Sequence, residues 1–259
     1  MLFAAIVVLT NLLGAVKIDS VGARIVSYVP AGGSETVFCS AAKIPEGECV
    51  EVFNGGVPIC WPWVYDDWGR RRSIHGFAYR MPWRQIESQS PDTCIFILES
   101  SPETRKEWPH DFRLVYKIRL GNMLECSLKT ENTGVSAFSF TEALHPYFAV
   151  GDLDRVKVLG LGDEAVQCRE HVKGVFENAS GQTALVEIDD FSLSRRISVS
   201  SQGAARTVVW NRGKMPRSGY KEGDWRRFVC VEPANNLAED AITLEPGRSH
   251  ELKFAVSVK

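Results

Sequence analysis

The 259-residue chain is predicted to form an all-β protein, a large antiparallel β-sandwich with few short helices. Short apolar runs that alternate with polar residues recur along the chain, and Gly- or Pro-containing stretches separate them. Sustained helical periodicity is absent. No repeat, low-complexity tract or linker divides the sequence, so a single domain over residues 1–259 is expected.

The clearest local signal is a hairpin. Apolar and mostly charged side chains alternate over residues 112–120, and the alternation resumes over 124–129 after the turn-forming pair Gly121-Asn122. Further strands are expected at 95–98, 156–159, 184–188, 197–200, 207–210, 228–231 and 252–258.

The two remaining elements are a helical turn and the N-terminal segment. One helical turn is expected at 101–108, where Ser101 caps a start with Pro102 at the first helical position. At the N-terminus, the β-branched residues Ile6, Val7 and Val8 favour a first core strand that turns near Asn11.

The composition narrows the class of protein. A hydrophobic content of 44% and a net charge of −2 fit a soluble globular protein and give no support to a nucleic-acid or membrane partner. The run Arg70-Arg71-Arg72 is interpreted as a solvated loop. The apolar start is too short to span a bilayer and lacks the basic residues that precede a signal-peptide core.

Seven scattered cysteines without a CxxC spacing indicate free thiols rather than a metal or redox site. Cys94, Cys126 and Cys230 lie in apolar or alternating runs, where a thiol behaves as a small buried hydrophobe. A cytoplasmic monomer without a metal is therefore expected.

Three segments contain residues that ordinary strands do not need. In the first, Asn54-Gly55-Gly56 leads into Trp61 and Trp63, and His75-Gly76-Phe77-Ala78-Tyr79-Arg80 leads into Trp83. The tryptophans offer flat apolar faces for a sugar ring. The alternative is a Gly- and Pro-rich corner with all three tryptophans in the core.

The second segment, Glu142-Ala143-Leu144-His145-Pro146-Tyr147-Phe148, places a histidine where a strand leaves the core. Imidazole titrates near neutrality, so His145 suits proton transfer, although a hydrogen-bonded structural histidine is the open alternative.

In the third segment, Glu232 interrupts an apolar strand that begins at Phe228. A carboxylate there costs free energy unless it is paired, for example with Arg226 or Arg227, or used as a base. No nucleotide-binding, zinc-protease or serine-hydrolase motif is present, so chemistry that moves only protons is favoured.

Taken in order, seven segments resemble the glucose-6-phosphate 1-epimerase (hexose-6-phosphate mutarotase) branch of the galactose-mutarotase-like superfamily. They are GGVPICWPW, HGFA with a following PW, SPETRKEWPHDFRLVYKIRL, ALHPYF, VGDLDRVKVLGL, TVVWN and FVCVEPAN, and they cover the chain from about residue 12 to its end.

The resemblance implies a galactose-mutarotase-like supersandwich that holds a sugar or sugar phosphate and uses no cofactor. It also implies that Glu232 removes the proton of the anomeric hydroxyl while protonated His145 donates to the ring oxygen. His75 is implied to hydrogen-bond the ring oxygen or a neighbouring hydroxyl.

Departures from the family pattern affect the phosphate. Asn54 and Tyr79 stand where the family has arginines, and Lys173 stands at an expected acidic position. Neither Asn54 nor Tyr79 supplies a guanidinium, so compensation by Arg80, by one of Arg70 to Arg72, by Lys173 or by Lys214 is a hypothesis. The residues expected to bind substrate are Asn54, Tyr79, Arg80, Asp152, Lys173 and Lys214.

Two other functions remain open. The chain could be a non-catalytic carbohydrate-binding or regulatory protein of the same fold. Glycoside hydrolysis would need a second carboxylate near Glu232, such as that of Asp152.

Overall fold

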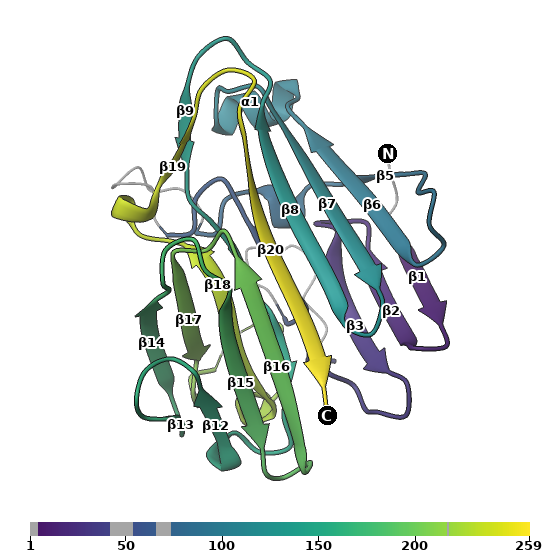
Figure 1. Ribbon diagram of the computed structural model, residues 1–259, viewed down its shortest axis with the longest axis vertical. Helices are drawn as coiled ribbons and strands as arrows, with labels where there is room; N and C mark the ends of the chain where they lie inside the picture. The colour runs from purple at the N-terminus through teal and green to yellow at the C-terminus, as the bar shows by residue number, and fades with distance from the viewer. Residues whose placement is uncertain (1–4, 42–53, 66–73, 217) are drawn as a thin grey trace.

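The computed structural model describes residues 5–41, 54–65, 74–216 and 218–259, and its strands form a large antiparallel β-sandwich (Figure 1). All pairs of neighbouring strands are antiparallel, as the sequence predicts. The largest sheet has nine strands. In spatial order they are β13 (Val166–Cys168), β12 (Val156–Leu159), β15 (Ala184–Asp190), β16 (Arg195–Gln202), β20 (Ser249–Val258), β8 (Leu124–Asn132), β7 (Phe112–Leu120), β6 (Thr93–Glu99) and β5 (Arg84–Ile86).

A six-stranded sheet faces this one. Its strands run in the order β14 (Val172–Glu177), β17 (Arg206–Asn211), β18 (Phe228–Asn235), β10 (Glu142–Leu144) and β4 (Ile59–Cys60), with β11 (Tyr147–Ala149) also paired to β18. Two smaller sheets complete the fold, namely β1 (Ile6–Asn11), β2 (Gly14–Asp19) and β3 (Arg24–Pro30), and the pair β9 (Phe138–Phe140) and β19 (Ile242–Leu244).

The core lies between the sheets. Leu114 and Tyr116 of β7, Val229 and Val231 of β18 and Val16 of β2 belong to one buried apolar cluster. The burial of β7 alternates residue by residue, because every second side chain points into this cluster. The predicted hairpin is confirmed: Leu120 pairs with Leu124 across the turn.

The helices are few and short, as predicted. The helix α1 (Pro102–Glu107) begins at a cap in which the Ser101 hydroxyl accepts from the Thr104 backbone N–H. Single 3-10 turns lie at η1 (Ala78–Arg80), η2 (Leu153–Arg155), η3 (Asp224–Arg227) and η4 (Ala238–Asp240). Among the described residues no helix has the length and apolar character that a membrane span requires.

One expectation about the N-terminus is wrong in part. The segment forms the strand β1, but Ile6 and Val8 are 55% and 56% exposed, and only Leu9 is buried. The reason is that side chains alternate along β1, so Ile6 and Val8 lie on the face opposite to that of Leu9, and this outer face is open to solvent.

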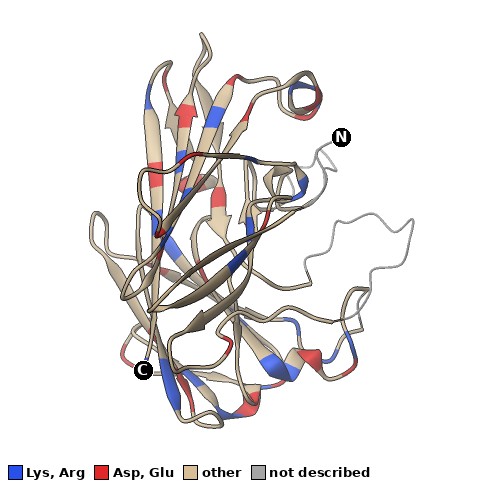
Figure 2. Ribbon diagram, turned by 90° about the vertical axis from the view of Figure 1, so that its right-hand side faces the viewer, with Lys and Arg blue, Asp and Glu red and all other residues tan. Residues whose placement is uncertain are grey.

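The cysteines and the charged residues are placed as the sequence predicts. Cys94, Cys126 and Cys230 are buried free thiols, whereas Cys49 lies outside the described residues. Figure 2 shows acidic and basic residues interspersed along the strands, as the small net charge suggests. The run Arg70 to Arg72 also lies outside the described residues.

Candidate active site

The candidate site is built on the face of β18 that points away from the core between the sheets. Val229 and Val231 enter that core, while Cys230 and Ala234, on the alternate positions, belong to a second buried cluster on the other face. Because side chains alternate along a strand, Glu232 lies on the same face as Cys230. Its side chain is 7% exposed.

His145 is held opposite Glu232 by strand register. Ala143 of β10 pairs with Ala234, and Tyr147 of β11 pairs with Cys230. Position 145 lies midway between 143 and 147, so it faces Glu232, which lies midway between Cys230 and Ala234. The backbone N–H of His145 donates to the Pro58 carbonyl at 3.0 Å, which continues the pairing of β10 with β4. Directly opposite side chains on one face are neighbours, and His145 Nε2 lies 3.4 Å from Glu232 Oε1.

A cavity of about 190 Å³ opens above this pair. Its floor includes a row of neighbours across the sheet, in which Lys173 of β14 pairs with Trp210 of β17, and Trp210 pairs with Cys230. The lining residues are Val64, Tyr65, Ile74, His75, His145, Tyr147, Lys173, Val208, Trp210 and Glu232. The cavity thus combines one buried carboxylate, two imidazoles, one ammonium and several aromatic faces.

His75 enters the cavity from a tight backbone turn. Its φ is 71°, and its ring centroid lies 5.6 Å from that of His145 in an edge-to-face arrangement. The next residue, Gly76, has φ 68°, and a Cβ there would lie 2.0 Å from the Trp61 carbonyl oxygen. Only glycine fits at position 76, so the glycine after His75 is a packing requirement that fixes where the imidazole enters.

Aromatic rings hold the imidazole of His145 from two sides. The ring of Tyr147 stacks on it at 4.9 Å, and Trp210 contacts it edge-on at 5.7 Å. These contacts restrict the rotation of His145, so its Nε2 atom stays directed toward Glu232.

Burial dominates the electrostatics of the pair. Removal from water raises the pKa of the Glu232 carboxyl well above 4.5. The alternative in which Arg226 pairs with Glu232 is not found, because Arg226 binds Asp152 at 3.0 Å and Asp154 at 3.0 Å instead. Glu232 is therefore not locked by that arginine, and a raised pKa in a cavity is typical of groups that transfer protons.

The other residues expected to bind substrate are more scattered, and of them only Lys173 lines the cavity. The Asn54 side chain accepts from Arg24 at 3.0 Å, and Tyr79 is buried in the apolar cluster beneath the site. Arg80 binds Glu107 at 2.5 Å, and Lys214 pairs with Glu170. These ion pairs show where the cations are engaged in the described part of the chain.

The three tryptophans of the first segment lie in the core, which was the alternative to a sugar-binding role. Trp61, Trp63 and Trp83 are buried to 5% exposure or less within the main core, so none of them offers a face to a ligand. The indole on the cavity wall belongs to Trp210, which sequence reasoning placed only in a strand. Its position would follow from the sequence only if the pairing of β17 with β18 were known.

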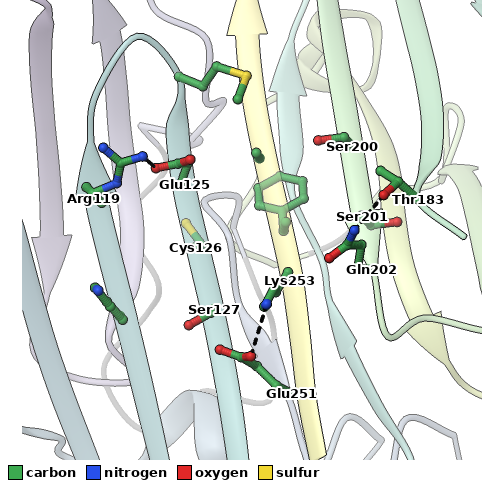
Figure 3. Close-up of a pocket in the computed structure, with 14 residues that line it drawn as sticks. Arg119, Glu125, Cys126, Ser127, Thr183, Ser200, Ser201, Gln202, Glu251 and Lys253 are labelled. Atoms are coloured by element: carbon green, nitrogen blue, oxygen red, sulfur yellow. Dashed lines mark hydrogen bonds and ion pairs between the residues drawn. The ribbon is translucent and has the colours of Figure 1, made fainter. Parts of the chain in front are cut away.

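A second hollow, of about 420 Å³, lies on the outer side of the nine-stranded sheet (Figure 3). Four of its charged side chains form two ion pairs, since Arg119 pairs with Glu125 and Lys253 lies 3.3 Å from Glu251. No histidine is among the described residues that line it. We therefore place the candidate chemistry in the cavity of His145 and Glu232.

One group of described residues has the donor types of a metal site. Single donor atoms of His145, Cys230 and Glu232 lie within 4.8 Å of one another. Burial raises the pKa of the Cys230 thiol well above 9.0, so its thiolate is disfavoured at neutral pH. The expectation of a metal-free site remains a prediction.

The fold and the cavity define the class of protein. A crystal structure of a putative mutarotase from Salmonella typhimurium superimposes with a TM-score of 0.87 at 28% identity, covering 98% of this chain and 90% of that one. A galactose mutarotase related enzyme from Lactobacillus acidophilus shares the fold with a TM-score of 0.78 at 17% identity, covering 98% of this chain and 97% of that one. The predicted galactose-mutarotase-like β-sandwich is confirmed.

Sequence comparison gives the family. The model of the aldose 1-epimerase family matches residues 5–175. A protein of Escherichia coli K12 named "Putative glucose-6-phosphate 1-epimerase" is 35% identical over 249 residues, which cover 86% of this chain and 81% of the relative. The chain belongs to the aldose 1-epimerase family, and its class is that of an isomerase.

The turn at Gly76 gives the first prediction. Gly76→Ala should lower the melting temperature and abolish sugar turnover, because the methyl group would collide with the Trp61 carbonyl and displace His75. Gly181→Ala is the matched control: its φ of 71° is similar, but no described atom lies within 4 Å of the place its methyl group would take. The control should lose only about 1–2 kcal/mol of stability through backbone strain. Equal effects of the two substitutions would contradict this account.

The burial of Glu232 gives a stability prediction. A carboxyl whose pKa is raised in the folded state destabilises the fold as pH rises above its unfolded value of 4.5. Glu232→Gln should therefore melt at a higher temperature than the wild type at pH 8, and the difference should vanish near pH 4.5. Melting curves across this pH range test it, and a variant less stable at pH 8 would refute it.

Proposed function

We propose that this protein interconverts the α and β anomers of an aldohexose by acid-base ring opening, and that its substrate is a hexose 6-phosphate. The observation that carries the proposal is the opposition of His145 Nε2 and Glu232 Oε1 at 3.4 Å in one cavity. Family membership and relatives named as glucose-6-phosphate 1-epimerases support the reaction class.

The separation of the two groups suits the reaction. The anomeric hydroxyl oxygen and the ring oxygen of a pyranose are bonded to the same carbon, C1. A carboxylate oxygen and an imidazole nitrogen 3.4 Å apart face these two oxygens together, without having to lie on opposite sides of the ring. The geometry thus allows two proton transfers at one carbon.

The proposed reaction balances its protons within the pair. Glu232 takes the proton of the anomeric hydroxyl while the His145 imidazolium gives one to the ring oxygen, and the C1–O5 bond breaks to leave an aldehyde. Rotation about the C1–C2 bond presents the other face of the carbonyl. Reversal of both transfers closes the second anomer and restores the starting protonation of Glu232 and His145.

The cavity supplies what the pair alone lacks. Burial raises the pKa of Glu232 well above 4.5, so its carboxylate is a stronger base than that of an ordinary exposed glutamate. The half-buried face of Trp210 gives a sugar ring an apolar surface. His75, at the edge of the same cavity, is placed to hydrogen-bond a hydroxyl or the ring oxygen.

A second candidate, non-catalytic sugar binding, has one observation in its favour. Asn54 and Tyr79 stand where arginines are expected, and neither lines the cavity. A protein that lost its substrate contacts while keeping the fold would bind sugar without exchanging anomers. Glycoside hydrolysis is disfavoured, because Asp152 is bound by Arg226 and is not among the residues that line the cavity.

The reaction can be tested by magnetisation-exchange NMR on anomers of glucose and glucose 6-phosphate. Wild-type protein should accelerate exchange, and Glu232→Gln should reduce the rate by at least about 100-fold, the lower range for one acid-base group. Glu187→Gln, which removes a partly exposed carboxylate of the nine-stranded sheet, is the control and should retain the rate. Saturable sugar binding without exchange would select the second candidate.

The raised pKa of Glu232 also predicts a pH profile. The base must be ionised, so kcat/KM should be low at acidic pH. It should rise with pH through a midpoint well above 4.5. Stopped-flow polarimetry from pH 4 to 9 would measure this profile. A midpoint at the pKa of an ordinary exposed glutamate would contradict the assignment of Glu232 as the base.

A further inference from the structure

From the arrangement of cations on this sheet face, we propose that Lys173 and Arg212 form an anion subsite that receives the phosphate of a phosphorylated hexose bound at His145 and Glu232. This inference rests on the proposed function, because it deepens the same site. It moves the phosphate contacts away from Asn54 and Tyr79, the positions where the family pattern has arginines.

Among the described residues that line the cavity, Lys173 is the cation. It pairs in register with Trp210, which pairs with Cys230, so Lys173 lies one row along the sheet from Glu232. Rows on one face are two residues, or about 7 Å, apart. Lys173 is exposed and makes no ion pair with any described residue. Its ammonium is thus available to a substituent at the far side of a sugar ring.

Arg212 lies one row further along the same face. It follows Trp210 by two residues, beyond the last pair of β17 with β14. Its guanidinium stacks at 5.1 Å on the ring of Tyr220, and that ring lies 6.1 Å from Phe228. Diagonal neighbours on one sheet face come within reach of long side chains, so Lys173 and Arg212 can meet a single anion.

The hollow beside Arg212 is large and basic. It has a volume of about 780 Å³, and its lining includes Arg212, Lys221, the carboxylate of Glu222 and Lys214, whose ammonium is paired with Glu170. The ring of Phe228 lies 5.0 Å from that of Tyr147, which lines the cavity of His145, and 6.1 Å from that of Tyr220, which lines this hollow. The two hollows are therefore adjacent along one sheet face.

Three other cations form contacts within the fold. Arg80 is bound by Glu107, and the ammonium of Lys214 by Glu170. Arg24 holds Asn54 at 3.0 Å and lies 3.9 Å from Asp19. A planar guanidinium and a lysine together suit a phosphate dianion, which accepts several charge-assisted hydrogen bonds.

The test compares glucose 6-phosphate with glucose on wild-type protein and on Lys173→Gln, Arg212→Gln and Lys117→Gln. Titration calorimetry gives both dissociation constants, and magnetisation exchange gives both values of kcat/KM. For Lys173→Gln and Arg212→Gln, the preference for the phosphorylated sugar should fall roughly tenfold, as expected for one charge-assisted hydrogen bond. Lys117, an exposed lysine of β7, is the control, and its variant should keep the wild-type preference.

Two outcomes would overturn the subsite: a wild type that does not prefer the phosphorylated sugar, or a Lys173→Gln variant with an unchanged preference. Lys173 is exposed, so this variant is expected to fold even if Arg212→Gln, at a buried position, does not. A wild type without anomer exchange would refute the proposed function alone, because the calorimetric preference and its loss in Lys173→Gln do not depend on turnover.

Discussion

The candidate site depends on one constraint, the shared register in which β10 and β11 pair with β18. Ala143 opposes Ala234 and Tyr147 opposes Cys230, so His145 falls opposite Glu232 although Pro146 interrupts the strand. A slip of one residue would turn every side chain of β18 to the other face and place valines where the carboxylate now lies. The apolar core fixes this register, because Val229 and Val231 are fully buried in it.

A second histidine–glutamate pair, which links the six-stranded sheet to the nine-stranded sheet, shows what distinguishes the site. Glu142 of β10 points into the space between the sheets, where its carboxylate lies 3.1 Å from His250 of β20. Burial raises the pKa of Glu142, but it is fully buried, also contacts Asn235, and lines no described cavity. Glu142 and His250 thus join two sheets, whereas Glu232 and His145 meet at a cavity. Burial and pairing are common to both pairs, and access to a ligand is not.

The sequence predicts strands well because alternation is a local property. The hairpin of β7 and β8 and the capped start of α1 each follow from residues within a few positions of one another. The exposure of Ile6 and Val8 does not, since whether one face of a strand is covered by another layer depends on segments distant in the chain. The meeting of His145 with Glu232 is of the latter kind, and the resemblance to a family indicated it where the pattern of residues alone could not.

The cations were the hardest residues to place from sequence, and the reason is energetic. An exposed arginine or lysine gains at most about 1 kcal/mol from any one carboxylate, so it pairs with whichever acid the fold brings near. Arg226 pairs with Asp152 and Asp154 rather than with Glu232, because Glu232 lies further along a strand of buried side chains. Proximity in sequence therefore says little about which cation serves a site. The period of two along each strand does identify the face, and on this face the pairing of β14, β17 and β18 places Lys173, alone among the cations of the described residues, in the cavity of the buried carboxylate.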